Sequence, residues 1–158
     1  MIDPYYQALP KKRMGAGALF FNEQGKILIV KPTYKDHWSI PGGVVDENES
    51  PRTACIREIK EELGLVVTSL NLLCIDYRTA TTDRDECLQF IFSGGILTTE
   101  QITAIRLPPD ELSGFKFMDA TDASPLLSVG LRQRITLCLD ALKTNTCIYL
   151  EDSEMVGR

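Results

Sequence analysis

The chain has 158 residues, 44% hydrophobic and 25% charged, which suits one domain with a substantial core and is short for two. Its apolar runs fall well short of the roughly 20 residues that a membrane-spanning helix needs, so we expect no membrane segment. Seventeen Lys and Arg against 22 Asp and Glu give a net charge of −5, which argues against a long nucleic acid as partner, because binding to a phosphate backbone needs a basic surface.

The first elements of the chain are typical of a β-hairpin that leads into a glycine-rich loop. Residues 16–21 and 27–30 are short apolar runs on either side of a turn sequence, which predicts two paired strands. Residues 37–41 predict a further short strand. The glycines at 42 and 43 allow unusual backbone angles, so we expect a sharp loop there.

A helix of about three turns follows this loop. Ser50 and Pro51 supply a cap and a favourable first position, and Gly64 supplies a stop. Between them an apolar stripe repeats at four-residue spacing; it consists of Cys55, Ile59 and Leu63. We expect this stripe to pack against a sheet.

The second half of the chain continues the mixture of strands and helices. Residues 70–77, 88–92 and 115–118 predict strands, 126–142 predict a helix, and 146–150 predict an edge strand. No internal repeat or flexible linker interrupts the pattern.

These elements favour an α/β or α+β sandwich formed by one domain over residues 1–158. We expect loose segments at residues 1–13 and 151–158. The N-terminal residues lack the apolar core of a signal peptide, which favours a cytoplasmic protein. Five cysteines, odd in number and distant from one another, indicate reduced thiols instead of a disulfide framework.

The polar side of the predicted helix carries the residues with the clearest chemical potential. Glu58, Glu61 and Glu62 lie three and four residues apart, away from the apolar stripe, so their carboxylates project into one volume. Arg57 offsets part of their repulsion, whereas Glu49 adds a further negative charge. A solvated acidic helix face is one interpretation. The other is a magnesium or manganese site, because these ions prefer hard oxygen ligands.

The sequence from Gly43 to Leu65 satisfies the pattern GX5EX7REUXEEXGU, where U is apolar, at every specified position. Seven fixed residues match by chance about once in 10⁸ windows, given ordinary residue frequencies. The segment resembles the Nudix box, the signature of the Nudix hydrolases. It is formed by Gly43, Glu49, Arg57, Glu58, Ile59, Glu61, Glu62, Gly64 and Leu65.

The resemblance implies a fold, a reaction and a metal. The fold is the Nudix-type α/β/α sandwich with a mixed central sheet. The reaction is pyrophosphatase chemistry, the hydrolysis of the diphosphate linkage in a nucleoside diphosphate derivative with Mg²⁺ or Mn²⁺. Glu58, Glu61 and Glu62 are then metal ligands, together with the carbonyl oxygen of Gly43.

Other roles follow from the same resemblance. Arg57 orients a neighbouring glutamate, for which Glu49 is the candidate, and Glu49 is also counted with the metal-binding residues. The general base is Glu58, or Glu61 as a ligand that shares the attacking water. Glu111 precedes a predicted strand where the family often supplies another acid to the metal, although it could equally cap a turn.

Several residues outside the box are candidates for holding the substrate. Tyr34 and Trp38 lie upstream of the glycine loop and could stack on a nucleobase, although Trp38 could instead belong to the core. Lys11, Lys12 and Arg13 could reach distal phosphates, and the alternative is a solvated basic turn.

The leading hypothesis is a cytoplasmic hydrolase of a small nucleotide, such as a modified nucleoside triphosphate. An alternative within the same chemistry is a nucleotide-sugar or ADP-ribose-type pyrophosphatase. A third hypothesis, of another class, is a non-catalytic nucleotide-sensing domain with the same fold. The resemblance also implies that a homodimer is a common state.

Overall fold

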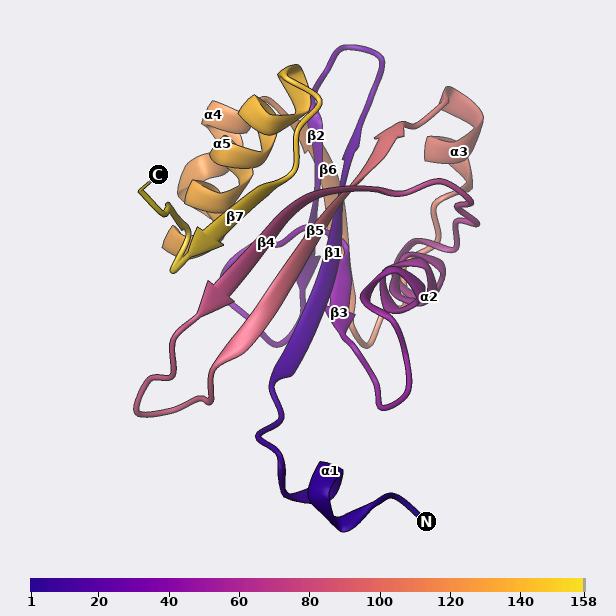
Figure 1. Cartoon of the computed structure of the whole chain (residues 1–158). Coiled ribbons are helices and arrows are strands. Elements are labelled where there is room, and N and C mark those ends of the chain that lie inside the picture. Colours follow the sequence, from indigo (N-terminus) through magenta and orange to yellow (C-terminus); the bar gives the residue numbers. More distant parts are fainter. Residues whose placement is uncertain (158) are drawn as a thin grey trace.

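The structure, a computed structural model, describes residues 1–157 and has three layers, with a sheet between two groups of helices (Figure 1). The strands are β1 (Arg13–Phe21), β2 (Ile27–Pro32), β3 (Gly42–Val44), β4 (Asn71–Arg78), β5 (Cys87–Ile96), β6 (Leu112–Met118), β7 (Ile148–Glu151) and β8 (Glu154–Met155). The helices are α1 (Pro4–Ala8), α2 (Pro51–Leu63), α3 (Thr99–Ala104), α4 (Ala120–Ala123), the 3₁₀ helix η1 (Ser124–Leu126) and α5 (Val129–Lys143). The predicted α/β/α sandwich is confirmed.

The sheet is mixed, as predicted, and its strand order is β6-β2-β1-β5-β4-β7-β8, with β3 paired to β1. The pairs β1–β5 and β4–β7 are parallel, and the others are antiparallel. β1 changes partner along its length, because β3 pairs with residues 15–17 whereas β2 pairs with it at Phe21. β3 therefore occupies the half of β1 that β2 leaves.

Two hydrophobic cores lie on opposite faces of the sheet, as the alternation of β1 side chains shows. Ala18 and Phe20 belong to the core under α2 and α3, whereas Leu19 and Phe21 belong to the core under α4 and α5. A strand that is covered on both faces has continuous apolar residues instead of alternating ones.

Helix α2 has the predicted bounds. The Ser50 side chain accepts a hydrogen bond from the Thr53 amide, and Gly64 ends the helix in the left-handed conformation with φ 70°. The predicted apolar stripe is fully buried in the core under α2. The caps and the stripe together fix both the length and the rotation of the helix.

The segment that enters α2 differs from the prediction. Residues 37–41 form no strand, because Trp38 and Ser39 make only isolated bridges. The glycines predicted to form a loop instead begin strand β3. Gly42 has φ 146°, and a Cβ atom there would lie 2.2 Å from the carbonyl oxygen of Ala16. Glycine is thus required by the close approach of two backbones.

The two ends of the chain differ from each other. Helix α1 is exposed and projects away from the sheet (Figure 1). The segment expected to be loose from residue 151 instead turns back as β8, so β7 is not an edge strand. Ser153 in this turn is buried and donates hydrogen bonds to Asp76. Within residues 1–157, no helix has the length and apolar character needed to cross a membrane.

Candidate active site

Arg57 of α2 is the centre of an ionic network. Its Nε and Nη2 donate to the two carboxylate oxygens of Glu49 at 3.0 and 2.9 Å. Its Nη1 donates to Glu58 at 2.7 Å and to Glu61 at 3.2 Å. The hydrogen bond from Arg57 lowers the pKa of Glu49, and the bonds to Glu49 and Glu58 raise the pKa of Arg57. Such a bidentate arrangement fixes both partners in orientation.

Glu62 lies against the sheet, not on the face away from the apolar stripe as predicted. It is only 7% exposed, and its Oε2 accepts a hydrogen bond of 2.8 Å from the amide of Gly42. Burial raises the pKa of Glu62 to about 7, despite this bond. The prediction failed here because the amide of Gly42, on a strand beside the helix, binds the Glu62 carboxylate and holds it against the sheet.

Glu58 occupies the same space, one turn nearer the start of α2. A Cβ atom on Gly43 would lie 2.4 Å from the carboxyl carbon of Glu58. Burial raises the pKa of Glu58, although Arg57 opposes the shift. The absence of a side chain at Gly43 therefore lets the Glu58 carboxylate approach β3.

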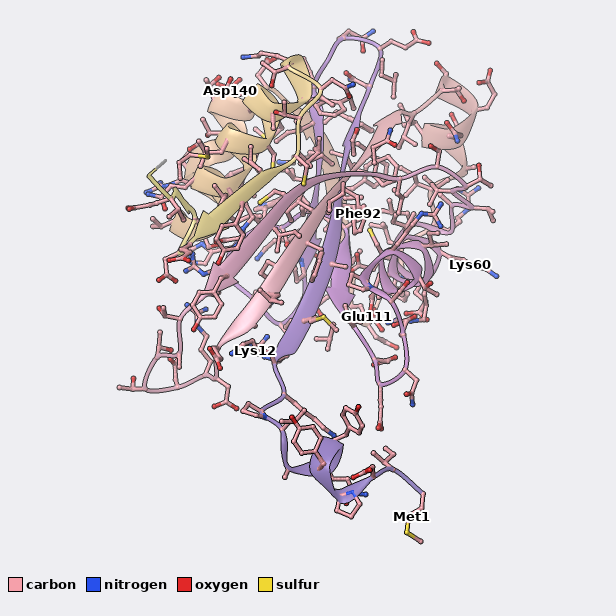
Figure 2. All side chains as sticks on the ribbon, in the orientation of Figure 1. Met1, Lys12, Lys60, Phe92, Glu111 and Asp140 are labelled. Atoms are coloured by element: carbon pink, nitrogen blue, oxygen red, sulfur yellow. The ribbon has the colours of Figure 1, made fainter. Side chains whose placement is uncertain are left out.

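Glu111, in the turn before β6, is placed near these glutamates. Its charge contributes to the raised pKa values of Glu58 and Glu62, and Figure 2 shows it beside α2. Tyr34 is near the same group, because its pKa is raised first by burial and then by the charges of Glu62, Glu111 and Glu58. We call Glu58, Glu61, Glu62 and Glu111 the acidic cluster.

The acidic cluster has the chemistry of a divalent-cation site. Its donors are hard carboxylate oxygens, and the raised pKa values of Glu58 and Glu62 show negative charge that burial destabilises. Within residues 1–157 no three acidic, Cys or His side chains converge as a ready-made ligand set, since Arg57 draws Glu58 and Glu61 toward itself. The residue types fit Mg²⁺ or Mn²⁺, and cation binding would require these two side chains to turn away from the arginine.

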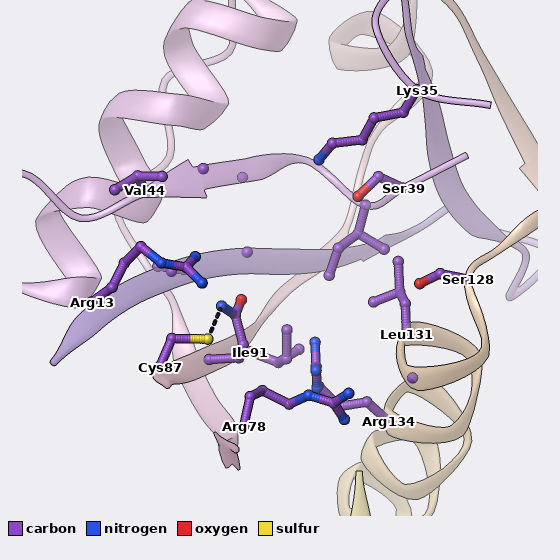
Figure 3. A pocket seen from close by; sticks show the side chains of 18 of the residues that line it. Arg13, Lys35, Ser39, Val44, Arg78, Cys87, Ile91, Ser128, Leu131 and Arg134 are labelled. Atoms are coloured by element: carbon purple, nitrogen blue, oxygen red, sulfur yellow. Dashed lines mark hydrogen bonds between the residues drawn. The ribbon is translucent and has the colours of Figure 1, made fainter. Parts of the chain in front are cut away.

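A pocket of about 550 Å³ opens on the other side of β3, between the sheet and the start of α5 (Figure 3). Five basic side chains line it, and among residues 1–157 no acidic or aromatic side chain does so. We call it the basic pocket. Its basic residues are Arg13, Lys35, Arg78, Arg84 and Arg134.

The residues predicted to hold the substrate are only partly brought together. Arg13 lines the basic pocket, whereas Tyr34, Trp38 and Lys11 do not. Tyr34 is 69% exposed beside the acidic cluster, and Lys11 is exposed before β1. Lys12, at the start of β1 in Figure 2, forms an ion pair with Glu86.

Trp38 belongs to the core, which was the second interpretation of this residue. It packs on the cluster under α4 and α5, and its amide donates to the carbonyl of Leu126 at 2.9 Å. Lys116 Nζ lies 5.1 Å from its ring centroid. The indole is thus partly buried against this core and does not line the basic pocket.

Four basic residues of the pocket were not predicted from the sequence. They come from the loop after β2, from β4, from the loop before β5 and from α5, so no spacing in the sequence connects them. They are Lys35, Arg78, Arg84 and Arg134. Only the sheet order brings them to one place.

Comparison with known proteins agrees with this arrangement. A model of the NUDIX domain family matches residues 11–138. The chain is 41% identical over 61 residues to the RNA pyrophosphohydrolase of Hydrogenovibrio crunogenus, a match that covers 39% of this chain and 37% of that protein. It is 28% identical over 128 residues to the MutT-like protein of Streptomyces ambofaciens, over 73% of this chain and 80% of that one.

Solved structures show the same fold. The crystal structure of a MutT NUDIX hydrolase from Burkholderia pseudomallei has a TM-score of 0.66 and 26% identity, and covers 81% of this chain and 97% of that chain. The match to the Hydrogenovibrio protein, in contrast, spans little more than a third of that relative's length.

Proposed function

The chain belongs to the NUDIX domain family, and from this premise we propose that it hydrolyses the diphosphate linkage of a nucleoside diphosphate derivative. One observation carries the proposal. The glycine strand β3 has the acidic cluster against one side and lines the basic pocket with the other. A substrate with an anionic linkage and an attached group can lie across this strand.

The acidic cluster requires a divalent cation for this reaction. A diphosphate is a polyanion and would be repelled by clustered carboxylates unless positive charge stood between them. When bound, Mg²⁺ or Mn²⁺ would neutralise phosphate oxygens and lower the pKa of an attacking water. We assign Glu58, Glu61 and Glu62 as its ligands, with the Gly43 carbonyl and Glu111 as further oxygen donors.

Arg57 is proposed as the residue that positions the glutamates, with Glu49 as its fixed partner. Of the two candidate bases, Glu61 has the more accessible carboxylate, since its side chain is 53% exposed and that of Glu58 is 16% exposed. This supports Glu61 as the group that accepts the proton of the attacking water. Glu58, which is held by Arg57 and buried beside Gly43, then serves only as a ligand.

The substrate is proposed to be a small nucleotide, such as a modified nucleoside triphosphate. The volume of the basic pocket, about 550 Å³, lies within the range of small-molecule sites. We also propose that the chain forms a single domain, because its two hydrophobic cores share one sheet. A homodimer and a cytoplasmic location stay predictions.

The proposal is tested with a panel of nucleoside triphosphates, nucleotide sugars and dinucleotides, assayed with Mg²⁺ and then Mn²⁺. Products are identified as phosphate, pyrophosphate or monophosphate, and ¹⁸O water locates the attacked phosphorus. We expect turnover of at least one class and its reversible loss with excess EDTA. Tight binding of one compound without turnover of any would instead support a nucleotide-sensing domain, and activity that survives EDTA would contradict the mechanism.

A further inference from the structure

The basic pocket carries more positive charge than its ion pairs compensate. Five basic side chains line it, whereas only two acids, Asp76 and Asp152, lie within 4 Å of any of them. Arg13, Lys35 and Arg84 have no acidic partner at this distance among residues 1–157. In a chain of net charge −5, this local excess is a specific feature of the pocket.

Two guanidinium groups form the end of the pocket that is remote from β3 (Figure 3). Arg134 Nε donates to Asp76 at 2.8 Å, and Arg78 Nη1 lies 3.8 Å from the same carboxylate oxygen. The side chain of Arg134 is only 9% exposed, yet it lines the pocket. Asp76 is fully buried beneath them, so it orients both groups without entering the pocket.

Ser153, in the turn between β7 and β8, holds the side chain of Arg78 in place. The Ser153 hydroxyl accepts a hydrogen bond from Arg78 Nη1 at 2.7 Å and donates one to Asp76 at 3.0 Å. The Ser153 amide donates to the other carboxylate oxygen of Asp76, also at 3.0 Å. A guanidinium held in this way loses little freedom when it binds an anion.

The start of helix α5 adds to the same end of the pocket. Residues 128–131 line it, and the N-cap Ser128 makes no side-chain hydrogen bond to the helix. The positive end of this 15-residue helix therefore faces the guanidinium groups, and free amides there favour an anion. A Cβ atom on Gly130 would lie 3.3 Å from both Nη atoms of Arg78, so glycine lets the guanidinium lie against the helix.

This end of the pocket is too far from the acidic cluster to bind the diphosphate that is cleaved. The strands β3, β1, β5 and β4 lie side by side, and three steps of about 4.8 Å give about 14 Å between β3 and β4. That separation is several times the length of a P–O–P linkage. Asp76 and Ser153 hold the guanidinium groups of Arg134 and Arg78 near β4, so these groups serve a different part of the ligand.

From these observations we infer that the basic pocket binds a second phosphate group of the substrate, carried on the side away from the diphosphate linkage, so that among small nucleotides the preferred substrate carries a phosphate beyond its nucleoside and is not a simple nucleoside triphosphate. The inference rests on the proposed function only for the direction in which the substrate lies. The pocket has no aromatic side chain on which a base could stack, and its fixed guanidinium groups match a phosphate. The second phosphate could be a terminal monoester or the next phosphodiester of an oligonucleotide.

Calorimetric binding in the presence of Mg²⁺ tests the inference without turnover. Adenosine 3′,5′-bisphosphate and adenosine 5′-monophosphate differ only in the second phosphate, and neither contains a diphosphate. We expect the bisphosphate to bind at least about tenfold more tightly, as one added charge-assisted phosphate contact predicts. Equal dissociation constants, or no measurable binding of the bisphosphate, would overturn the inference.

Three variants locate the effect. Arg78→Gln and Arg84→Gln should each reduce the preference to less than about threefold, and Arg84 has an exposed side chain outside the Asp76 network, so its replacement keeps the fold. Arg106→Gln, on the α2 side of the sheet, is the matched control and should retain the preference. A preference that survives in both pocket variants would refute the assignment.

A 5′-phosphorylated adenylyl dinucleotide distinguishes the two sources. Binding as tight as that of the bisphosphate indicates an oligonucleotide end, and binding as weak as that of the monophosphate indicates a terminal phosphate. Turnover of the nucleotide panel without the bisphosphate preference would overturn this inference alone. The preference without turnover of any compound would overturn the proposed function alone.

Discussion

The acidic cluster and the basic pocket lie on two sides of one glycine strand but are built in opposite ways. Three of the four glutamates of the cluster come from one helix, and one arginine of that helix connects two of them, Glu58 and Glu61. The five basic residues of the pocket come from five separate segments. The cluster therefore depends on local helix geometry, whereas the pocket depends on the whole sheet and on the C-terminal turn.

The two regions also differ in electrostatic balance. Burial and mutual repulsion raise the pKa values of Glu58 and Glu62, so the cluster is destabilised until positive charge arrives. Three of the five cations of the pocket, Arg13, Lys35 and Arg84, are exposed, and Asp76 and Asp152 compensate part of the charge of the other two. These opposite charges suit a cation on one side and an anionic group on the other, which is what the two proposals require.

The largest effect should come from removing a charge of the cluster. We expect Glu62→Gln and Glu61→Gln each to reduce kcat at least about 100-fold, because each removes a ligand that holds the cation at the reacting phosphate. Steady-state kinetics with Mg²⁺ measures this effect, and circular dichroism checks the fold. The control is Glu47→Gln, an exposed residue outside the cluster, which should leave kcat unchanged. Full activity of either cluster variant would eliminate that residue as a ligand.

A second expected effect concerns stability without metal. The folded-state pKa of Glu62, about 7, lies above the ordinary glutamate pKa of 4.5, so its contribution to stability is greatest below pH 4.5 and is lost as the pH rises through 7. The loss amounts to about 3 kcal/mol. Urea unfolding with EDTA should therefore show Glu62→Gln to be more stable than the native protein at pH 8 and not at pH 4.

Addition of Mg²⁺ gives a second test of the buried charge of Glu62. The cation should raise the free energy of unfolding of the native protein at pH 8 and have little effect on Glu62→Gln, since ligand binding stabilises only the state that binds it. If the variant and the native protein keep the same stability difference at both pH values, Glu62 does not carry the buried charge.

The smallest effect should come from the edge of the basic pocket. We expect Arg13→Ala to raise KM about threefold to tenfold with kcat nearly unchanged, because an exposed guanidinium contributes binding but no chemistry. Lys11→Ala should change KM less than twofold, since Lys11 does not line the pocket. Equal effects of the two changes would show that the N-terminal basic residues act only through long-range charge.

The sequence predicts the bounds of helix α2, which carries three of the four glutamates of the acidic cluster. Ser50 and Gly64 mark the ends of α2 because caps act through local hydrogen bonds and local backbone angles. The buried position of Glu62 was not predictable from helical spacing alone, since it depends on the amide of Gly42 on another strand.

Local sequence patterns do not predict the residues of the basic pocket. Arg78 and Arg134 are 56 positions apart and meet only because Asp76 is buried between β4 and α5. The sequence around Trp38 was compatible with two environments, a base-stacking surface and a core. The structure packs Trp38 against α4 and η1. Pairings of this kind are fixed by tertiary contacts, which override local preference.

The late position of Ser153 in the chain means that the acidic cluster and the basic pocket are completed at different times during synthesis. On the ribosome, α2 and its glutamates emerge about ninety residues before Ser153 does. A nascent chain can therefore complete helix α2 while Arg78 still lacks its hydrogen-bond partner Ser153. The end of the basic pocket formed by Arg78 and Arg134 is then the last part of the proposed site to become ordered, and a chain released before this turn would carry the acidic cluster without a fixed Arg78 across the sheet.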